Sequence, residues 1–184
     1  MTKILGAALA FATLTFGASA ALAQDTAPDG TDAFGFEPYV GVIGGYESFD
    51  KFRDGPRQGN GRGNGAIVGV VGGVNVPLGP VFVGVEGNGA KGFNDIDWEY
   101  GVAGRFGVRA GESGLIFAKV GYQWVEFDHG PRASKMLYGI GTEVGPKDIG
   151  LGGITGNSGI RLRFGVDTLD WQSIRPNAGV VMHF

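Results

Sequence analysis

The chain contains no cysteine, and it has no large excess of either charge, with 18 acidic and 15 basic residues. The absence of cysteine excludes disulfides and thiolate metal sites, so an exported protein of this size must be stable without them. The formal net charge is −3, whereas proteins dedicated to nucleic acids are normally basic, so we expect no nucleic-acid partner. After residue 23 no uncharged apolar run approaches the roughly 20 residues of a membrane-spanning helix, which excludes a helical membrane protein.

Glycine is the residue in excess. The chain has 37 glycines among 184 residues, which is about 20%, whereas the usual share is about 7%. Most of them lie inside alternating runs of valine, phenylalanine and tyrosine, and there is no collagen-like period of three. Glycine weakens a strand but permits close backbone approach and tight curvature, so this placement favours a small, strongly coiled barrel.

The first 23 residues have the pattern of a secretory signal. Lys3 is followed by an uncharged stretch from Ile4 to Ala23 that ends in small residues. We expect cleavage between Ala23 and Gln24, which removes residues 1–23; the alternative is an uncleaved membrane anchor. Residues 24–37 are interpreted as a flexible leader, and residues 38–184 as the folded domain.

The rest of the chain divides into segments that alternate with period two. In the last one Ala178, Val180, Met182 and Phe184 share an apolar face, and we interpret Phe184 as the C-terminal signal of an outer-membrane barrel. An even number of strands of about ten residues predicts an eight-stranded antiparallel transmembrane up-and-down β-barrel. The expected strands are 38–48, 66–76, 81–90, 98–110, 115–127, 136–144, 160–168 and 175–184.

The connections are predicted to alternate in length. Segments 77–80 and 111–114 are short enough for periplasmic turns, whereas 49–65 and 128–135 are long and polar, as expected of cell-surface loops. Segment 145–159 is too long and rich in glycine for a tight turn. It either extends a neighbouring strand or marks a shift in the expected register.

The faces opposite the apolar ones carry both signs of charge. An eight-stranded barrel is just wide enough to be filled by its own side chains, so these charges predict a lumen plugged by ion pairs. We assign them a structural role rather than one in transport, because removing one partner of a buried pair leaves an uncompensated charge. The network comprises Glu47, Glu86, Glu99, Glu143 and Asp167 with Arg105, Arg109, Lys119, Arg161 and Arg163.

The chain resembles the small outer-membrane β-barrel family, which includes opacity proteins, surface antigens and the OmpX/OmpA-barrel type. The resemblance is carried by Tyr39-Val-Gly-Val-Ile-Gly-Gly-Tyr46, Val83-Gly-Val-Glu-Gly87 and Ala178-Gly-Val-Val-Met-His-Phe184. It implies the outer membrane of a Gram-negative envelope, and a role in surface adhesion, envelope integrity or host contact. The expected partners are outer-membrane lipids and lipopolysaccharide, the barrel-assembly machinery, and a ligand on a host or neighbouring cell.

Three alternatives remain open. The protein is a narrow porin of the porin family if the lumen conducts, and a soluble lipocalin-like barrel if the apolar face points inward. It is a lipid-modifying hydrolase if Asp128, His129 and Ser134 form a triad. We expect no enzymatic activity, and we assign no catalytic, cofactor or metal-binding residue.

Two further motifs concern the surface. Lys51, Arg53, Arg57 and Arg62 make a basic loop around a glycine-rich stretch, for which contact with lipopolysaccharide is one hypothesis and simple solvation the other. The oxygens of 94–97 are too few for a calcium site. A set of Trp and Tyr residues predicts an interfacial girdle: Trp98, Tyr100, Tyr122, Trp124 and Tyr138.

Overall fold

The computed structural model describes residues 36–49, 65–93, 96–110, 114–127, 132–145 and 159–184. The expected signal segment, its cleavage site at Ala23 and Gln24, and the basic loop with Lys51 lie outside these ranges. Among the described residues, no helix is long and apolar enough to cross a membrane.

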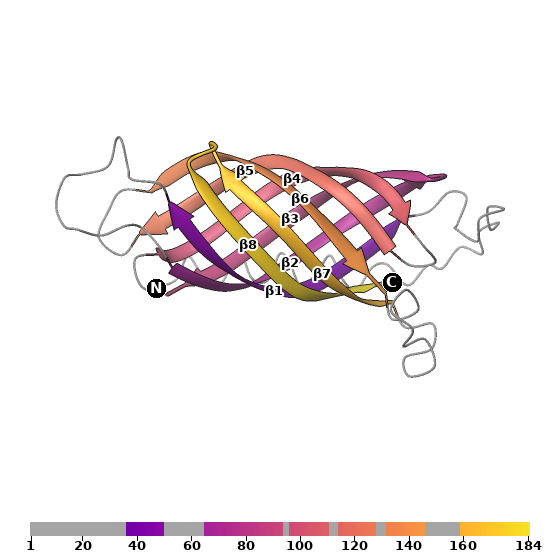
Figure 1. Ribbon diagram of the computed structural model, residues 1–184, viewed down its shortest axis with the longest axis horizontal. Helices are drawn as coiled ribbons and strands as arrows, with labels where there is room; N and C mark the ends of the chain where they lie inside the picture. The colour runs from indigo at the N-terminus through magenta and orange to yellow at the C-terminus, as the bar shows by residue number, and fades with distance from the viewer. Residues whose placement is uncertain (1–35, 50–64, 94–95, 111–113, 128–131, 146–158) are drawn as a thin grey trace, which may run out of the picture.

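Eight antiparallel strands form a closed barrel in which each strand pairs with its neighbours in sequence, and the last pairs with the first (Figure 1). The prediction of an eight-stranded up-and-down barrel is confirmed. The strands are β1 (Glu37–Phe49), β2 (Gly65–Leu78), β3 (Val81–Gly92), β4 (Ile96–Ala110), β5 (Gly114–Phe127), β6 (Ala133–Val144), β7 (Ile160–Leu169) and β8 (Ser173–His183).

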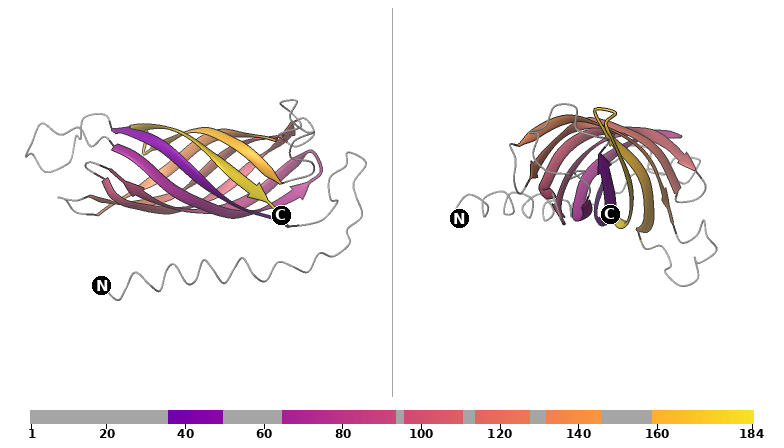
Figure 2. Two further views of the ribbon diagram at one scale, coloured as in Figure 1. Left: turned by 90° about the horizontal axis from the view of Figure 1, so that it is seen from below. Right: turned by 60° about the vertical axis from the view of Figure 1, so that its left-hand side comes forward.

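The strands tilt around a common axis and leave no free edge (Figure 2). Closure runs along β1 and β8, from Tyr39 opposite His183 to Phe49 opposite Ser173. Backbone groups in the wall are therefore paired on both sides, which a segment in lipid requires. We refer below to the two ends of the barrel as the Gly79 end, where β2 turns into β3, and the Trp171 end, where β7 turns into β8.

The side chains alternate between the two faces of the wall as the sequence pattern predicts. In β4, Trp98, Tyr100 and Val102 are exposed on the outside, whereas Glu99 and Ala103 are buried inside. The expected register of the seventh strand is confirmed, since Leu162 and Phe164 face outward and Arg163 is buried. Of the long segment before it, residues 146–158 lie outside the described ranges.

Every strand extends beyond its expected bounds by one to three residues at one end or both, and two of these differences change an expected connection. The expected leader 24–37 is one residue too long, because Glu37 already belongs to β1 and pairs with Asn75. The expected turn at 77–80 is shorter, because β2 continues to Leu78, which pairs with Val81. Only Gly79 and Pro80 connect the strands, and the positive φ of Gly79 (74°) is the conformation a two-residue hairpin requires at its first position.

Inward glycines let the wall and the interior side chains approach each other closely. A Cβ on Gly107 would lie 2.1 Å from the carbonyl oxygen of Ile116 and 2.8 Å from the Phe82 ring. On the same strand, a Cβ on the outward Gly104 would come no closer than 3.8 Å, to the carbonyl oxygen of Val120. Comparing the same substitution at the two positions therefore separates the effect of interior packing from the effect of strand propensity.

We expect Gly107→Ala to lower the free energy of unfolding by about 1–3 kcal/mol, because the added methyl group overpacks the interior. Gly104→Ala should change the free energy of unfolding by less than about 0.5 kcal/mol, as at other surface positions. Urea unfolding in phospholipid vesicles, followed by tryptophan fluorescence, measures both. Equal effects of the two substitutions would contradict the packing explanation.

Candidate functional site

The centre of the barrel interior is organised around Glu86 on β3. Its carboxylate accepts hydrogen bonds from Arg163 on β7 (3.0 Å), Lys119 on β5 (3.5 Å) and the Tyr39 hydroxyl on β1 (2.7 Å). Arg105 on β4 also lies 3.5 Å from it. All five side chains are buried, so a single carboxylate is surrounded by three cations contributed by different strands.

Glu143 on β6 forms the second centre, towards the Gly79 end. Arg105 donates a hydrogen bond to it at 2.8 Å, so the guanidinium of Arg105 lies between the two glutamates. The Nε2 atom of His183 lies 2.7 Å from the same carboxylate, and Arg161 and Arg163 are both 4.0 Å away. The ring of His183 stacks on Tyr39, with ring centroids 5.1 Å apart. Glu86 and Glu143 therefore share one continuous set of cations.

Arg175 on β8 is the centre of a third group, towards the Trp171 end. Its guanidinium pairs with Glu99 on the opposite side of the barrel and lies 3.6 Å from Glu47 and 3.5 Å from Asp167. Lys119 bridges to this group, since its ammonium lies 3.1 Å from Asp167 and 3.5 Å from Glu86. The three groups thus connect along the length of the lumen.

The structure places every residue of the expected charge network on the inner face. Glu47, Glu86, Glu99, Arg105, Lys119, Glu143, Arg163 and Asp167 are buried, while Arg109 and Arg161 are partly exposed near the Gly79 end. Sequence reasoning omitted Arg175 and Glu37. Arg175 alternates with the outward face of Ala178 and Val180, so the period of two could have found it. Glu37 was assigned to the leader, although it pairs with Arg109. With these two added, the network contains six carboxylates and six permanent cations.

Apolar side chains line the interior towards the Trp171 end. Ile96, Val125, Leu137 and Leu169 are at most 1% exposed, and they belong to one buried apolar cluster. We call the whole set the aliphatic layer: Ile67, Ala90, Ile96, Ala103, Val125, Leu137 and Leu169. Buried apolar side chains therefore occupy much of the interior at this end, among the residues that the structure describes.

Aromatic residues fill the interior towards the other end. Phe82, Leu115 and Phe117 form a buried cluster. The guanidinium of Arg105 lies 4.0 Å from the Phe117 ring centroid and 4.8 Å from that of Tyr39. Stacking on ring faces stabilises a buried cation beyond its ion pairs, so the charged groups and the aromatic cluster form one packed core.

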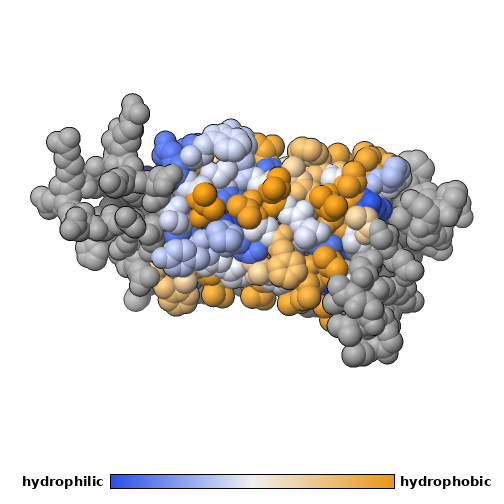
Figure 3. Space-filling view, in the orientation of Figure 1, coloured by the Kyte–Doolittle hydropathy of each residue, from blue (hydrophilic) through white to orange (hydrophobic). Residues whose placement is uncertain are grey.

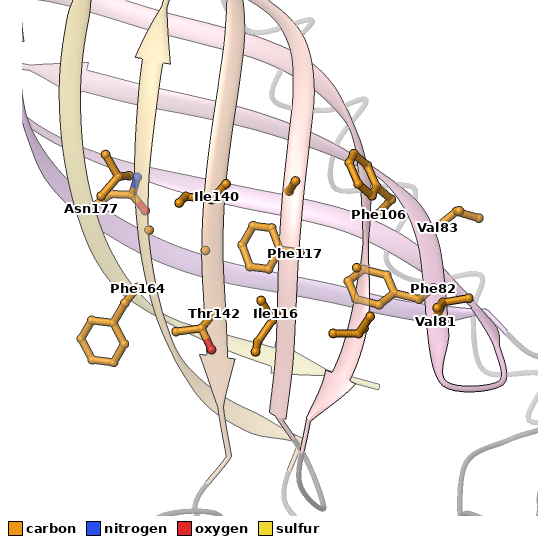
Figure 4. Close-up of a pocket in the computed structure, with 16 residues that line it drawn as sticks. Val81, Phe82, Val83, Phe106, Ile116, Phe117, Ile140, Thr142, Phe164 and Asn177 are labelled. Atoms are coloured by element: carbon orange, nitrogen blue, oxygen red, sulfur yellow. The ribbon is translucent and has the colours of Figure 1, made fainter.

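The outer wall is apolar, in contrast to the interior. Ile140 is 67% exposed and Val85 is 65% exposed, and hydrophobic residues cover much of the wall in Figure 3. An apolar groove with a volume of about 990 Å³ crosses the wall from β3 to β7 between such residues, including Phe106, Ile140 and Phe164 (Figure 4). A soluble barrel has the opposite arrangement, so the lipocalin-like alternative is wrong.

The hydrolase candidates are not assembled in the described residues. Asp128 and His129 lie outside these ranges, and Ser134 is exposed on the outer face of β6. Asp97, which belongs to the segment considered for calcium, pairs with Lys91. No cluster of three or more potential metal ligands occurs among the residues that the structure describes.

Together, the closed antiparallel wall, the apolar outer face and the charged interior define the class of the protein: it is an eight-stranded transmembrane β-barrel of the outer-membrane type. The expected location in the outer membrane follows from the same features.

Comparison with known proteins adds solved structures of similar fold. No family model matches the chain, and no curated protein matches it. The chain is similar to a de novo designed transmembrane β-barrel (14% identity, TM-score 0.49, covering 80% of this chain and 95% of that one). It is also similar to Ail, the attachment invasion locus protein of Yersinia pestis, solved with the heparin analogue sucrose octasulfate (16%, 0.47, 81% and 97%). Neisserial surface protein A is a third similar structure (13%, 0.45, 81% and 97%).

Proposed function

We propose that this protein is a closed, non-conducting outer-membrane barrel that acts through its surface, as a structural or adhesive component of the envelope. The observation that carries the proposal is the filled interior. The ion pairs around Glu86, Glu143 and Arg175 occupy the lumen, and the aliphatic layer adds buried apolar side chains beside them and towards the Trp171 end. A wall of eight strands leaves little space beyond that of its own side chains.

A surface role fits this arrangement because the interior charges are occupied with each other. Each carboxylate at the centre is shared by more than one cation, as Glu86 is by Arg105, Lys119 and Arg163. Groups held in this way have no exposed face for a substrate or a passing ion. The proposed partners are therefore outside the lumen: lipids and lipopolysaccharide around the wall, the barrel-assembly machinery during insertion, and a ligand on another cell.

We expect the refolded protein to produce no steady single-channel current in planar bilayers, because neither water nor ions have a continuous path through the packed interior. Heat-dependent gel mobility of the same preparation establishes that the barrel is folded. Stable, regular current steps from folded protein would overturn the closed-lumen proposal and support the narrow porin. Hydrolysis of an ester-containing lipid, lost in His129→Ala, would instead support the hydrolase.

A further inference from the structure

A cluster of aromatic side chains lies on the outer wall near the Trp171 end. Tyr100 on β4 stacks on Trp124 on β5, with ring centroids 5.5 Å apart and planes at 19°. Tyr122 meets Trp124 edge-on at 5.1 Å. Trp98 is exposed two residues before Tyr100 on β4. We call Trp98, Tyr100, Tyr122 and Trp124 the aromatic surface.

Two ion pairs flank the aromatic surface. On one side Lys91 pairs with Asp97 and lies 5.2 Å from the Trp98 ring. On the other side Arg132 pairs with Glu126 and lies 5.7 Å from the Tyr100 ring. The rim is therefore neutral in sum but rich in both hydrogen-bond donors and acceptors. Flat apolar faces with such a rim match a sugar ring, which has C–H faces and a border of hydroxyl groups.

An apolar groove begins at the aromatic surface and continues into the aliphatic part of the wall. It has a volume of about 520 Å³ and includes Tyr122, Val102 and Met136 in its lining. Its hollow follows from the outward glycines Gly72, Gly87 and Gly104, which have no side chain to fill it. Because Tyr122 belongs to both, the groove and the aromatic surface form one continuous feature.

The two ends of the barrel differ in their content of tyrosine and tryptophan. All three tryptophans, and every tyrosine except the interior Tyr39, lie towards the Trp171 end. At the Gly79 end the exposed residues include Leu78 and Val81, and the outward aromatic residues are phenylalanines such as Phe106 and Phe184. Aromatic side chains usually mark both interfaces of a transmembrane barrel. Among the described residues, the tyrosines and tryptophans, whose polar atoms can hydrogen-bond to a headgroup, are therefore concentrated at the Trp171 end.

We propose that the aromatic surface and its groove form a binding site for one glycolipid, with the sugar headgroup on the aromatic faces and an acyl chain in the groove. The inference rests on the proposed function and on the expected cell-surface loops 49–65 and 128–135, which connect strands at the Trp171 end and would place it at the outer leaflet. The flanking pairs Lys91–Asp97 and Glu126–Arg132 would contact hydroxyl or phosphate groups of the headgroup. A phospholipid headgroup has no broad C–H face and gains less from the stacked rings.

The site can be tested with lipid A in phosphatidylcholine nanodiscs, with phosphatidylglycerol as the competing anionic lipid and native mass spectrometry as the readout. The double substitution Tyr100→Leu and Trp124→Leu keeps the wall apolar but removes the flat faces. We expect it to weaken lipid A retention by about tenfold, as two lost stacking contacts of the usual strength would. Retention of phosphatidylglycerol should stay unchanged.

The groove gives an independent variant with a matched control. Gly104→Leu fills the groove, and Gly44→Leu adds the same side chain to an outward glycine on β1; a Cβ at either site comes no closer than 3.7 Å to its neighbours. Only Gly104→Leu should reduce lipid A retention. Unchanged retention in both variants, or equal loss of lipid A and phosphatidylglycerol, would overturn the glycolipid site. A channel current from the wild-type protein would count against the closed-lumen proposal, but it would not change the interpretation of lipid A retention.

Discussion

Replacing Glu86 with alanine is expected to lower the free energy of unfolding by about 3–5 kcal/mol, which is the usual cost of removing one partner from a buried ion pair. The loss is large because Arg105 and Arg163 are almost completely buried and Lys119 nearly so. Without Glu86, these three cations face one another in the lumen with fewer carboxylates to compensate them. Urea unfolding in phospholipid vesicles measures the change.

Two controls separate this effect from a general loss of ion pairing. Glu126→Ala removes the partly exposed partner of the exposed Arg132 and should cost at most about 1 kcal/mol. Adding Arg163→Met to Glu86→Ala should recover part of the stability, because it removes one of the uncompensated charges. If Glu86→Ala cost no more than Glu126→Ala, the interior network would not hold the barrel together.

Replacing Ile140 with arginine is expected to lower the free energy of unfolding by about 2–4 kcal/mol when the barrel is embedded in phospholipid. Ile140 projects from the middle of β6, and its neighbours across the wall are Ala118 and Val166. An arginine there must either enter the hydrocarbon region or bend towards an interface. Unfolding in vesicles, monitored by tryptophan fluorescence, reports the difference.

The position along the strand supplies the control. Ser134→Arg lies on the same face of β6 near its Trp171 end, where an added charge reaches the headgroups and should cost at most about 1 kcal/mol. A cost for Ile140→Arg within about 0.5 kcal/mol, the range of ordinary surface substitutions, would contradict the position of this face in lipid.

The fold could be predicted from the sequence because each strand carries its own period of two. From Trp98 in β4 and from Ile160 in β7, outward apolar residues alternate with an inner face that carries the charges, and both registers agree with the structure. The predicted ends of strands were less accurate where the residue types there are typical of turns. Pro77 and Leu78 have the composition of a turn, yet the pairing of Leu78 with Val81 extends the strand.

The partners inside the lumen could not be predicted in the same way. Parity along a strand decides that Glu99 faces inward, but not that its partner is Arg175 on the far side of the barrel. That pairing depends on how far the strands are staggered when the sheet closes. Tyr39 shows the same limit: alternation with the outward Val40 places it on the inner face, but does not predict that its hydroxyl donates to Glu86.

The span of the interior ion pairs along the chain has a consequence for assembly. Glu86 and Arg163 are 77 residues apart, Glu99 and Arg175 are 76 apart, and the seam between β1 and β8 joins strands near opposite ends of the described chain. A half-formed sheet therefore carries charges whose partners have not yet arrived, and hydrocarbon does not solvate them. Insertion and closure must therefore proceed together. A barrel with a missing strand or a shifted register would leave interior charges unpaired and would be unstable in the membrane.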